Sequence, residues 1–180
     1  DGVRILRELE TLPSKAREVL KKADLIEAIA QRYHRYNNWL FLGRKYNYPT
    51  ALEGALKLKE VSYIHAEGYA AGEMKHGPIA LINPKMPTVA IITRDEIYEK
   101  MINNIQEVKS RRGPVIAVCN EGDEKVKEMV DEVIEVPETL PFLSPILNVI
   151  PLQLLAYHCA RFLGRDIDKP RNLAKSVTVE

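Results

Sequence analysis

The feature that most constrains the fold of this 180-residue chain is an alternation of short apolar runs with longer stretches of helical periodicity. A strand that reads as one continuous apolar run is typical of a parallel sheet covered on both faces. Strands that alternate with helices also imply crossover connections between parallel strands. We therefore predict an α/β fold, a three-layer α-β-α sandwich with a parallel sheet of about five strands.

The predicted elements follow this pattern along the chain. Pro13 is expected to begin the second of two N-terminal helices, and Asp24 is expected to be the N-cap of a third. The strands are expected at residues 39–43, 88–92, 115–118 and 132–136, and residues 66–70 are expected to be a loop or a further strand. The helices are expected at residues 1–12, 13–22, 24–35, 49–61, 95–111, 124–130 and 145–164.

Composition excludes several classes of function. The chain has 26 basic and 25 acidic residues and a formal charge of +1, so it shows no electrostatic footprint for nucleic acid or a membrane surface. Its longest apolar stretch, 146–155, is shorter than the roughly 20 residues of a membrane span. No secretory signal pattern is present. The chain begins with Asp1 rather than Met, and we expect it to be a fragment.

The two cysteines, Cys119 and Cys159, each lie within an apolar pattern. Such cysteines are typical of the reduced core of a cytoplasmic protein. They do not form a Cys-x-x-Cys pair, and no two histidines have metal-ligand spacing, so we predict neither a metal nor another cofactor.

A stripe of charge on the predicted helix 49–61 is the first candidate site. Glu53, Lys57 and Glu60 are three and four residues apart, so they share one helical face. One interpretation is an exposed Glu-Lys-Glu ladder on an amphipathic helix. The other is a functional cluster, because burial of unpaired charge is costly. The helix leaves the first strand at its carboxyl end, where ligands bind in such folds, and this favours the second interpretation.

Each member of the stripe has a plausible chemical role. Glu60 is the candidate general base, able to move a proton between adjacent carbons of a carbonyl substrate. Lys57 would hold a substrate oxygen, and Glu53 would orient Lys57 or contact the substrate. The turn before the helix contains Arg44 and Lys45, which would either contact a phosphate at the helix N-terminus or form a solvated basic turn.

The histidines and the chain end supply further candidates. His76 precedes Gly-Pro, so it would project from a turn either as a proton shuttle or as an ordinary surface residue. We expect His34 to be exposed and His158 to be a satisfied core histidine, and His65 fits either interpretation. Near the C-terminus, Lys175 is either a surface lysine or an amine on a mobile segment that forms a Schiff base.

Four segments together resemble one family. They are ALEGALKLKE at 51–60, GEMKHGP at 72–78, PLQLLAYH at 151–158 and DKPRNLAKSVTVE at 168–180. This combination is similar to the second sugar-isomerase (SIS) subdomain of the glutamine:fructose-6-phosphate amidotransferases, the glucosamine-6-phosphate synthases. The resemblance implies a flavodoxin-like fold with five parallel strands. It also implies that glucosamine 6-phosphate is formed in the cytoplasm from fructose 6-phosphate and glutamine-derived ammonia.

The resemblance also implies roles for individual residues. Glu60 matches the base that moves a proton between C1 and C2 of the sugar, and Lys57 matches a lysine that assists at the same oxygens. His76 matches a histidine that opens the sugar ring in the neighbouring subunit's site. Lys175 matches the lysine that forms a Schiff base with the ketose, and Ala174 matches a backbone contact to the substrate beside it.

The family pattern further predicts how the chain is organised. Residues 1–22 are expected to be linker helices between subdomains, 23–165 the SIS domain and 166–180 a C-terminal active-site tail. The family's N-terminal glutaminase domain and first SIS subdomain, with its Ser/Thr-rich phosphate loop, are absent from this sequence. A homodimer is expected, with no nucleic-acid or membrane partner.

Three functional hypotheses follow. The first is the isomerase half of the synthase, nearly inactive as an isolated chain. The second is a non-catalytic regulatory module that binds sugar phosphates, although such a sensor needs neither a base at Glu60 nor an imine-forming lysine at Lys175. The third is a unit that serves mainly for dimerisation.

Overall fold

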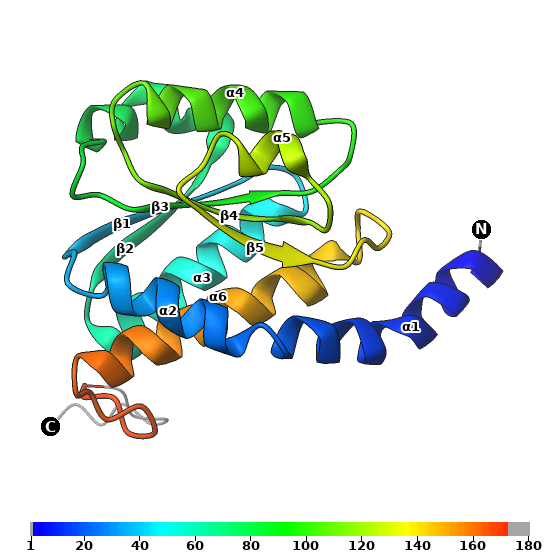
Figure 1. Cartoon of the computed structure of the whole chain (residues 1–180), viewed down its shortest axis with the longest axis horizontal. Coiled ribbons are helices and arrows are strands. Elements are labelled where there is room, and N and C mark those ends of the chain that lie inside the picture. Colours follow the sequence, from blue (N-terminus) through cyan, green and yellow to red (C-terminus); the bar gives the residue numbers. More distant parts are fainter. Residues whose placement is uncertain (1, 173–180) are drawn as a thin grey trace, which may run out of the picture.

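The computed structural model describes residues 2–172, and it contains a five-stranded, fully parallel sheet (Figure 1). The strand order is β2-β1-β3-β4-β5, the doubly wound order of flavodoxin-like folds. This arrangement confirms the predicted three-layer sandwich. The strands are β1 (Asn38–Gly43), β2 (His65–Ala70), β3 (Thr88–Ile92), β4 (Val115–Asn120) and β5 (Glu132–Val136).

Helices cover both faces of the sheet. On one face lie α1 (Gly2–Leu20), α2 (Ala23–Tyr33), α3 (Asn47–Ser62) and α6 (Ser144–Phe162). On the other face lie α4 (Tyr98–Lys109) and α5 (Glu124–Lys127) (Figure 1). Two short 3-10 helices, η1 (Ala71–His76) and η2 (Pro78–Leu81), connect β2 to β3.

Alternate residues of the apolar strands divide between two cores. In β1, Trp39 and Phe41 belong to the core under α2, α3 and α6, whereas Leu40 and Leu42 belong to the core under α4. Successive side chains of a strand point to opposite faces, so a strand covered on both sides is apolar throughout. Each fully buried large apolar side chain contributes about 1.5–3 kcal/mol. The continuous apolar runs of the sequence therefore have a direct packing explanation.

The N-terminal helices differ from the prediction. Helix α1 continues through Pro13 as one helix of 19 residues, although two helices were expected. A proline removes one backbone donor, and here the buried side chains Leu12 and Val19 on either side of it anchor the helix. Asp24 lies inside the first turn of α2, where its negative charge interacts favourably with the positive end of the helix dipole, and Lys22 occupies the N-cap position.

Other boundaries shift by a few residues. Helix α4 begins at Tyr98 rather than at Asp95, because the Asp95 carboxylate accepts a hydrogen bond from the Ile97 N–H at 2.9 Å and forms a turn before the helix. Strand β4 extends to Asn120, and α5 ends at Lys127.

The turn from β1 into α3 positions the candidate site. A Cβ atom on Gly43 would lie 2.0 Å from the Asn47 carbonyl oxygen, so only glycine allows the helix to begin this close to the strand. Helix α3 then runs back along the sheet, antiparallel to β1 and β2 (Figure 1). Its last turns therefore lie near the amino ends of these strands.

Two further expectations can be compared with the described part of the chain. Cys119 and Cys159 are free and buried, which confirms them as reduced core residues, and burial raises the pKa of both thiols to about 12. No helix within residues 2–172 is long and apolar enough to cross a membrane.

Candidate functional site

An open groove of about 610 Å³ lies where α3 ends and β2 begins. It is bounded by the last two turns of α3, the connection to β2 and the described end of the chain. Its lining residues are Leu56, Lys57, Lys59, Glu60, Tyr63, Ile64, His65, Arg171 and Asn172. Two of the residues singled out from the sequence, Lys57 and Glu60, therefore share one groove.

The groove lies at the amino end of the sheet, whereas the sequence argument placed Lys57 and Glu60 at the carboxyl end. That placement was wrong. A helix of 16 residues is about 24 Å long, which exceeds the length of a six-residue strand of about 20 Å. Residues in its last turns therefore reach the opposite edge, next to His65 at the start of β2.

The three charged side chains of α3 form an ordered ladder. Lys57 Nζ donates to Glu60 Oε2 at 2.6 Å and lies 3.8 Å from Glu53 Oε1. The hydrogen bond to Glu60 raises the pKa of Lys57 above its ordinary value, while burial acts in the opposite direction. The Lys57 ammonium is therefore held charged beside the Glu60 carboxylate, in a position to stabilise negative charge on an oxygen bound in the groove.

The ladder is partly exposed, as expected for an exposed Glu-Lys-Glu ladder on an amphipathic helix. About a third of each side chain is accessible: 37% for Glu53, 33% for Lys57 and 31% for Glu60. Two apolar side chains of the same helix, Leu52 and Leu56, are exposed as well. The structure thus shows an exposed ladder, and it places Lys57 and Glu60 of that ladder on the wall of the groove.

The chain returns to this groove near its C-terminus. The Arg171 N–H donates to the Tyr63 hydroxyl at 2.8 Å, which brings residues 171–172 against the end of α3. Lys175 and Ala174, both singled out from the sequence, lie outside the described residues.

His76 does not share the groove. It is the last residue of η1, which follows the carboxyl end of β2, whereas Glu60 lies near the amino end of that strand. The two ends of β2 are about 20 Å apart. The His76 side chain is 60% exposed, and its Nδ1 lies 3.8 Å from Glu73 Oε2. Within one chain, His76 and Glu60 therefore belong to opposite ends of the sheet.

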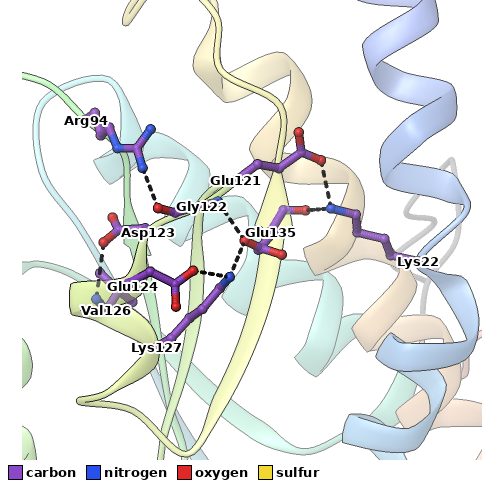
Figure 2. Close-up of polar contacts among 9 residues, drawn as sticks. All are labelled: Lys22, Arg94, Glu121, Gly122, Asp123, Glu124, Val126, Lys127 and Glu135. Atoms are coloured by element: carbon purple, nitrogen blue, oxygen red, sulfur yellow. Dashed lines mark hydrogen bonds and ion pairs between the residues drawn. The ribbon is translucent and has the colours of Figure 1, made fainter.

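The carboxyl end of the sheet carries a dense polar network (Figure 2). The Glu135 carboxylate on β5 accepts from the Gly122 N–H at 2.8 Å and lies 3.0 Å from Lys127 Nζ. Lys22 donates to the Glu135 carbonyl at 2.8 Å, and Arg94 donates to the Gly122 carbonyl at 2.9 Å. These contacts connect the loops after β3 and β4 to β5 and to the start of α2. The charged groups there are therefore paired with other groups of the protein.

The basic turn after β1 is also satisfied by the protein. Arg44 Nε donates to Asn104 Oδ1 at 3.0 Å, and Lys45 pairs with Glu96. These contacts favour an internally paired turn over a phosphate site.

The crevice between β1 and β3, where the strand order reverses, is filled. Asn47 donates to Thr93 Oγ1 at 3.0 Å and accepts from Asn148 Nδ2 at 2.8 Å, with both asparagines buried. The cavity volume beside Asn47 and Thr93 is about 0 Å³. This crevice is the usual ligand position in such folds, and here it has no room for one.

The remaining histidines are structural or exposed. His158 is buried as expected, but it is not satisfied: its Nδ1 has no hydrogen-bond partner within the described part of the chain and lies 3.8 Å from Glu27 Oε2. Burial lowers the pKa of His158. His34 is half-buried rather than exposed: its ring lies 5.3 Å from the Phe162 ring, and its Nδ1 lies 2.9 Å from the Gln31 carbonyl oxygen. His65 is exposed, with Nδ1 3.2 Å from Asn38 Oδ1.

Two groove residues were missed by the sequence analysis. Tyr63 and Arg171 meet only through the tertiary fold, and no periodicity or composition marks either of them. Among residues 2–172, no group of three or more His, Cys, Asp and Glu side chains could hold a metal ion.

Comparisons with known proteins identify similar chains. A model of the SIS domain matches residues 33–161. A glutamine–fructose-6-phosphate aminotransferase (isomerizing) of Thermus thermophilus is 58% identical over 180 residues, which are 100% of this chain and 30% of that protein. The enzyme of the same name from Bacteroides thetaiotaomicron is 56% identical over 176 residues, which are 98% of this chain and 29% of that protein.

A solved structure is similar as well. It is the C-terminal domain of the glucosamine-fructose-6-phosphate aminotransferase of Francisella tularensis, which is 42% identical with a TM-score of 0.84. The match covers 91% of this chain and 46% of that chain. The chain thus spans about 30% of the length of the curated relatives it matches.

Proposed function

The chain belongs to the SIS domain family, and on that basis we propose that it forms the isomerase part of a glucosamine-6-phosphate synthase. The reaction converts fructose 6-phosphate and glutamine-derived ammonia to glucosamine 6-phosphate and water. Relatives at 58% and 56% identity carry the name of this activity, which supports the proposal. The glutaminase and the first SIS subdomain would be contributed by the rest of a longer protein.

The observation that carries the proposal is the Lys57–Glu60 pair in a groove whose wall includes Arg171 and Asn172. Lys175 follows Asn172 by three residues. Three residues of chain span at most about 11 Å, so the Lys175 amine is within reach of the groove. A base, an ammonium group and an imine-forming amine would then meet around one hexose.

The mechanism uses each group for one proton or bond. The Lys175 amine adds to the C2 carbonyl of the open-chain ketose, water leaves and an imine forms. Ammonia replaces the lysine at C2. The Glu60 carboxylate removes a proton from C1 and returns it to C2, while the C1 hydroxyl loses its proton and the C2 nitrogen gains one, giving the aldehyde at C1 and the amine at C2. The Lys57 ammonium stabilises the negative charge that develops on the C1 oxygen.

His76 would open the sugar ring in a neighbouring subunit. Since His76 and Glu60 lie at opposite ends of β2 in one chain, this role requires a homodimer in which the histidine enters the partner's groove. Mixed dimers of Glu60→Gln and His76→Asn chains test this arrangement. Random pairing should restore about a quarter of wild-type activity, because each mixed dimer has one intact site. If His76 acted within its own chain, mixing would restore nothing.

The same proposal covers the organisation and location of the chain. Residues 1–22 would be linker helices between subdomains, 23–165 the SIS domain and 166–180 the active-site tail. We place the reaction in the cytoplasm, with fructose 6-phosphate and glucosamine 6-phosphate as the ligands.

The decisive experiment substitutes Glu60→Gln in the complete protein. Turnover should fall about 1000-fold, because a positioned acid–base group contributes about 100- to 10,000-fold. Calorimetric affinity for fructose 6-phosphate should change less than about threefold, because the amide keeps the shape and polarity of the carboxylate. Glu128→Gln, at an exposed position after α5, is the matched control and should leave turnover unchanged. Undiminished turnover in Glu60→Gln would contradict the proposal.

A second test uses the 180-residue chain by itself. We expect it to be nearly inactive, since the groove offers a base and an ammonium group but the phosphate loop is absent from this sequence. Robust synthesis of glucosamine 6-phosphate by this chain would contradict the division of labour proposed above.

A further inference from the structure

A second cavity lies beside the Lys57–Glu60 groove, and the proposed reaction makes no use of it. Its volume is about 380 Å³, and residues 63–65 line both cavities as a shared wall. Its polar side chains, apart from that wall, are His34, Arg35, Asn37, Ser62 and Arg165. Pockets that bind small ligands begin at about 300 Å³. The cavity therefore has room for a small solute.

The walls of this cavity carry positive charge. Arg35 and Arg165 are both exposed residues, and no Asp or Glu is among the described residues that line the cavity. An arginine side chain stays charged throughout the pH range of folded proteins. A concave surface with charge of one sign focuses the electrostatic potential and raises the local concentration of ions of the opposite sign. The cavity should therefore attract anions.

The two arginines differ from their neighbours in the sequence, which are paired with carboxylates. One turn before Arg35, Arg32 pairs with a glutamate of β5 at 2.6 Å. One turn before Arg165, Arg161 pairs with a glutamate of α2 at 3.0 Å. Within residues 2–172, no carboxylate forms an ion pair with Arg35 or Arg165. A guanidinium that has no carboxylate partner in this part of the chain can bind an anion from solution.

The Tyr63 ring contacts the Arg165 side chain. The centroid of the ring lies 5.2 Å from the Arg165 guanidinium and 4.3 Å from the guanidinium of Arg171, which lines the neighbouring groove. A cation–π contact uses the face of a guanidinium and leaves the N–H groups along its edge free to donate. Two like charges on one ring also repel each other, and a bound anion reduces that repulsion. Both effects favour an anion beside Arg165.

Three helices end at this cavity, and their dipoles suggest another role for the arginines. The C-cap residues that line it are His34 of α2, Tyr63 of α3 and Leu163 of α6. Cations stabilise the negative end of a helix dipole. However, the N–H groups of these three residues already bond to carbonyls of the last helical turns, at 2.8, 3.1 and 3.1 Å. The guanidiniums are therefore not needed to satisfy those carbonyls, and a measurement of anion binding separates the two roles.

We propose that the cavity binds a phosphoryl group between the guanidiniums of Arg35 and Arg165. A phosphate monoester carries about −1.5 to −2 charges at pH 7, which matches the two positive charges of the arginines. Each guanidinium presents parallel N–H donors to two oxygens, and a phosphoryl group has three terminal oxygens to share between two such forks. A carboxylate, with two oxygens and one charge, satisfies only one fork. This site is separate from the sugar site of the proposed reaction and does not depend on that reaction.

The 180-residue chain contains both buried cores of the sheet, so it can be titrated by itself with inorganic phosphate at constant ionic strength. Two-dimensional proton–nitrogen NMR follows the arginine Nε–H signals, and the dispersion of the backbone signals shows that each variant is folded. The Nε–H signals of Arg35 and Arg165 should shift saturably, with a dissociation constant in the millimolar range or below. If neither signal shows saturation below about 10 mM phosphate, the proposal is overturned.

Substitution of each arginine shows where the anion binds. Arg35→Gln and Arg165→Gln should each weaken phosphate binding about tenfold, because charge-assisted hydrogen bonds are lost. Arg35→Lys and Arg165→Lys should retain only part of the wild-type affinity, because an ammonium keeps the charge but lacks the fork. Arg17→Gln is the matched control, since it removes an exposed arginine in the last turn of α1, outside the cavity, and it should bind phosphate like the wild type. Equal affinity in all three glutamine variants would place the anion elsewhere and overturn the proposal.

Glycerol 3-phosphate and glycerol identify the source of the phosphoryl group. Tighter binding of glycerol 3-phosphate than of inorganic phosphate, lost in Arg165→Gln, would indicate a phosphate ester as the ligand, and weaker binding would indicate free phosphate. Glycerol should not shift the Arg35 and Arg165 signals. If glycerol shifts them as much as its phosphate ester does, the cavity does not recognise the phosphoryl group and the proposal is overturned.

Discussion

The two ends of the parallel sheet use their polar groups in opposite ways. At the carboxyl end, Glu135, Lys127, Lys22 and Arg94 are joined in one network, and the crevice beside Asn47 is filled. At the amino end, Lys57 and Glu60 line an open groove of about 610 Å³. The carboxyl end of the sheet, where this fold usually binds ligands, is filled by structural contacts. The amino end presents accessible charged side chains.

This contrast shows how far a topological rule extends. Ligands in open α/β sheets bind at the carboxyl ends because the loops that follow the strands meet there. The last turns of a crossover helix are not part of those loops. Helix α3 carries Lys57 and Glu60 the full length of the sheet, so the site that it builds lies at the other edge.

The largest effect should separate two lysines, one at each end. Lys57→Met in the complete protein should lower turnover about 100-fold, or about 2.7 kcal/mol of barrier, because the developing oxyanion loses its cation. Lys45→Met, which removes a lysine paired with Glu96 at the carboxyl end, should leave steady-state turnover unchanged. A comparable loss in both variants would break the comparison, since it would bring the carboxyl end into catalysis.

The next largest effect concerns stability at the carboxyl end. Asn47→Ala should lower the free energy of unfolding by about 2 kcal/mol, because Thr93 and Asn148 would lose their buried partner. Urea denaturation measures the change. Asn103→Ala, at an exposed position of α4, should stay within about 0.5 kcal/mol of the wild type. If the two variants are equally stable, the buried amide cluster is not structural.

Helix α6 contains a group, His158, whose protonation in mild acid should affect stability. Burial lowers the pKa of His158, so the unfolded chain binds its proton more readily than the native one. The stability that depends on neutral His158 is therefore complete above its ordinary pKa of about 6.5 and is lost as pH falls through the lowered folded value.

Unfolding measured in urea from pH 7 to pH 5 should show this loss in the wild type. His158→Leu should remove this part of the slope, although Glu27, Arg161 and Asp24 near the imidazole remain. An identical slope in both proteins would assign the pH dependence to other groups.

The smallest effect lies in the network of Figure 2. Burial raises the pKa of the Glu135 carboxyl, but the Gly122 N–H and the Lys127 ammonium outweigh it, and the net pKa is lowered. Glu135→Gln should cost less than about 1 kcal/mol at pH 7, because the pair is partly exposed. The difference from the wild type should shrink as pH falls below about 4.5. A cost that does not shrink at all as the pH is lowered would show that charge is not what Glu135 contributes.

Most of the fold could be predicted because its signals are local. The buried strands read as apolar runs, and the predicted strands 39–43, 88–92 and 132–136 match β1, β3 and β5 closely. Pro13 was misjudged because a proline disfavours a helix locally, whereas the packing of Leu12 and Val19 decides whether the helix continues.

The candidate site was predicted in part. Helical spacing was enough to bring Lys57 and Glu60 together, since three residues always return to the same face of a helix. The contact of Tyr63 with Arg165 and Arg171 could not be found in this way, because these arginines lie about a hundred residues further along the chain. The unsatisfied nitrogen of His158 depends on the distance to Glu27 across two packed helices.

By itself the sequence determined the parallel sheet, the free buried cysteines and the charged face of α3. Hydrophobic burial and helical periodicity act over a few residues, so a linear pattern can encode them. Only the tertiary structure decided that this face lies at the amino edge, that the carboxyl edge is closed by its own ion pairs, and that Tyr63 holds Arg171. Those outcomes depend on which distant segments pack together, such as α3 against the sheet and α6, and a linear pattern of residues does not encode such contacts.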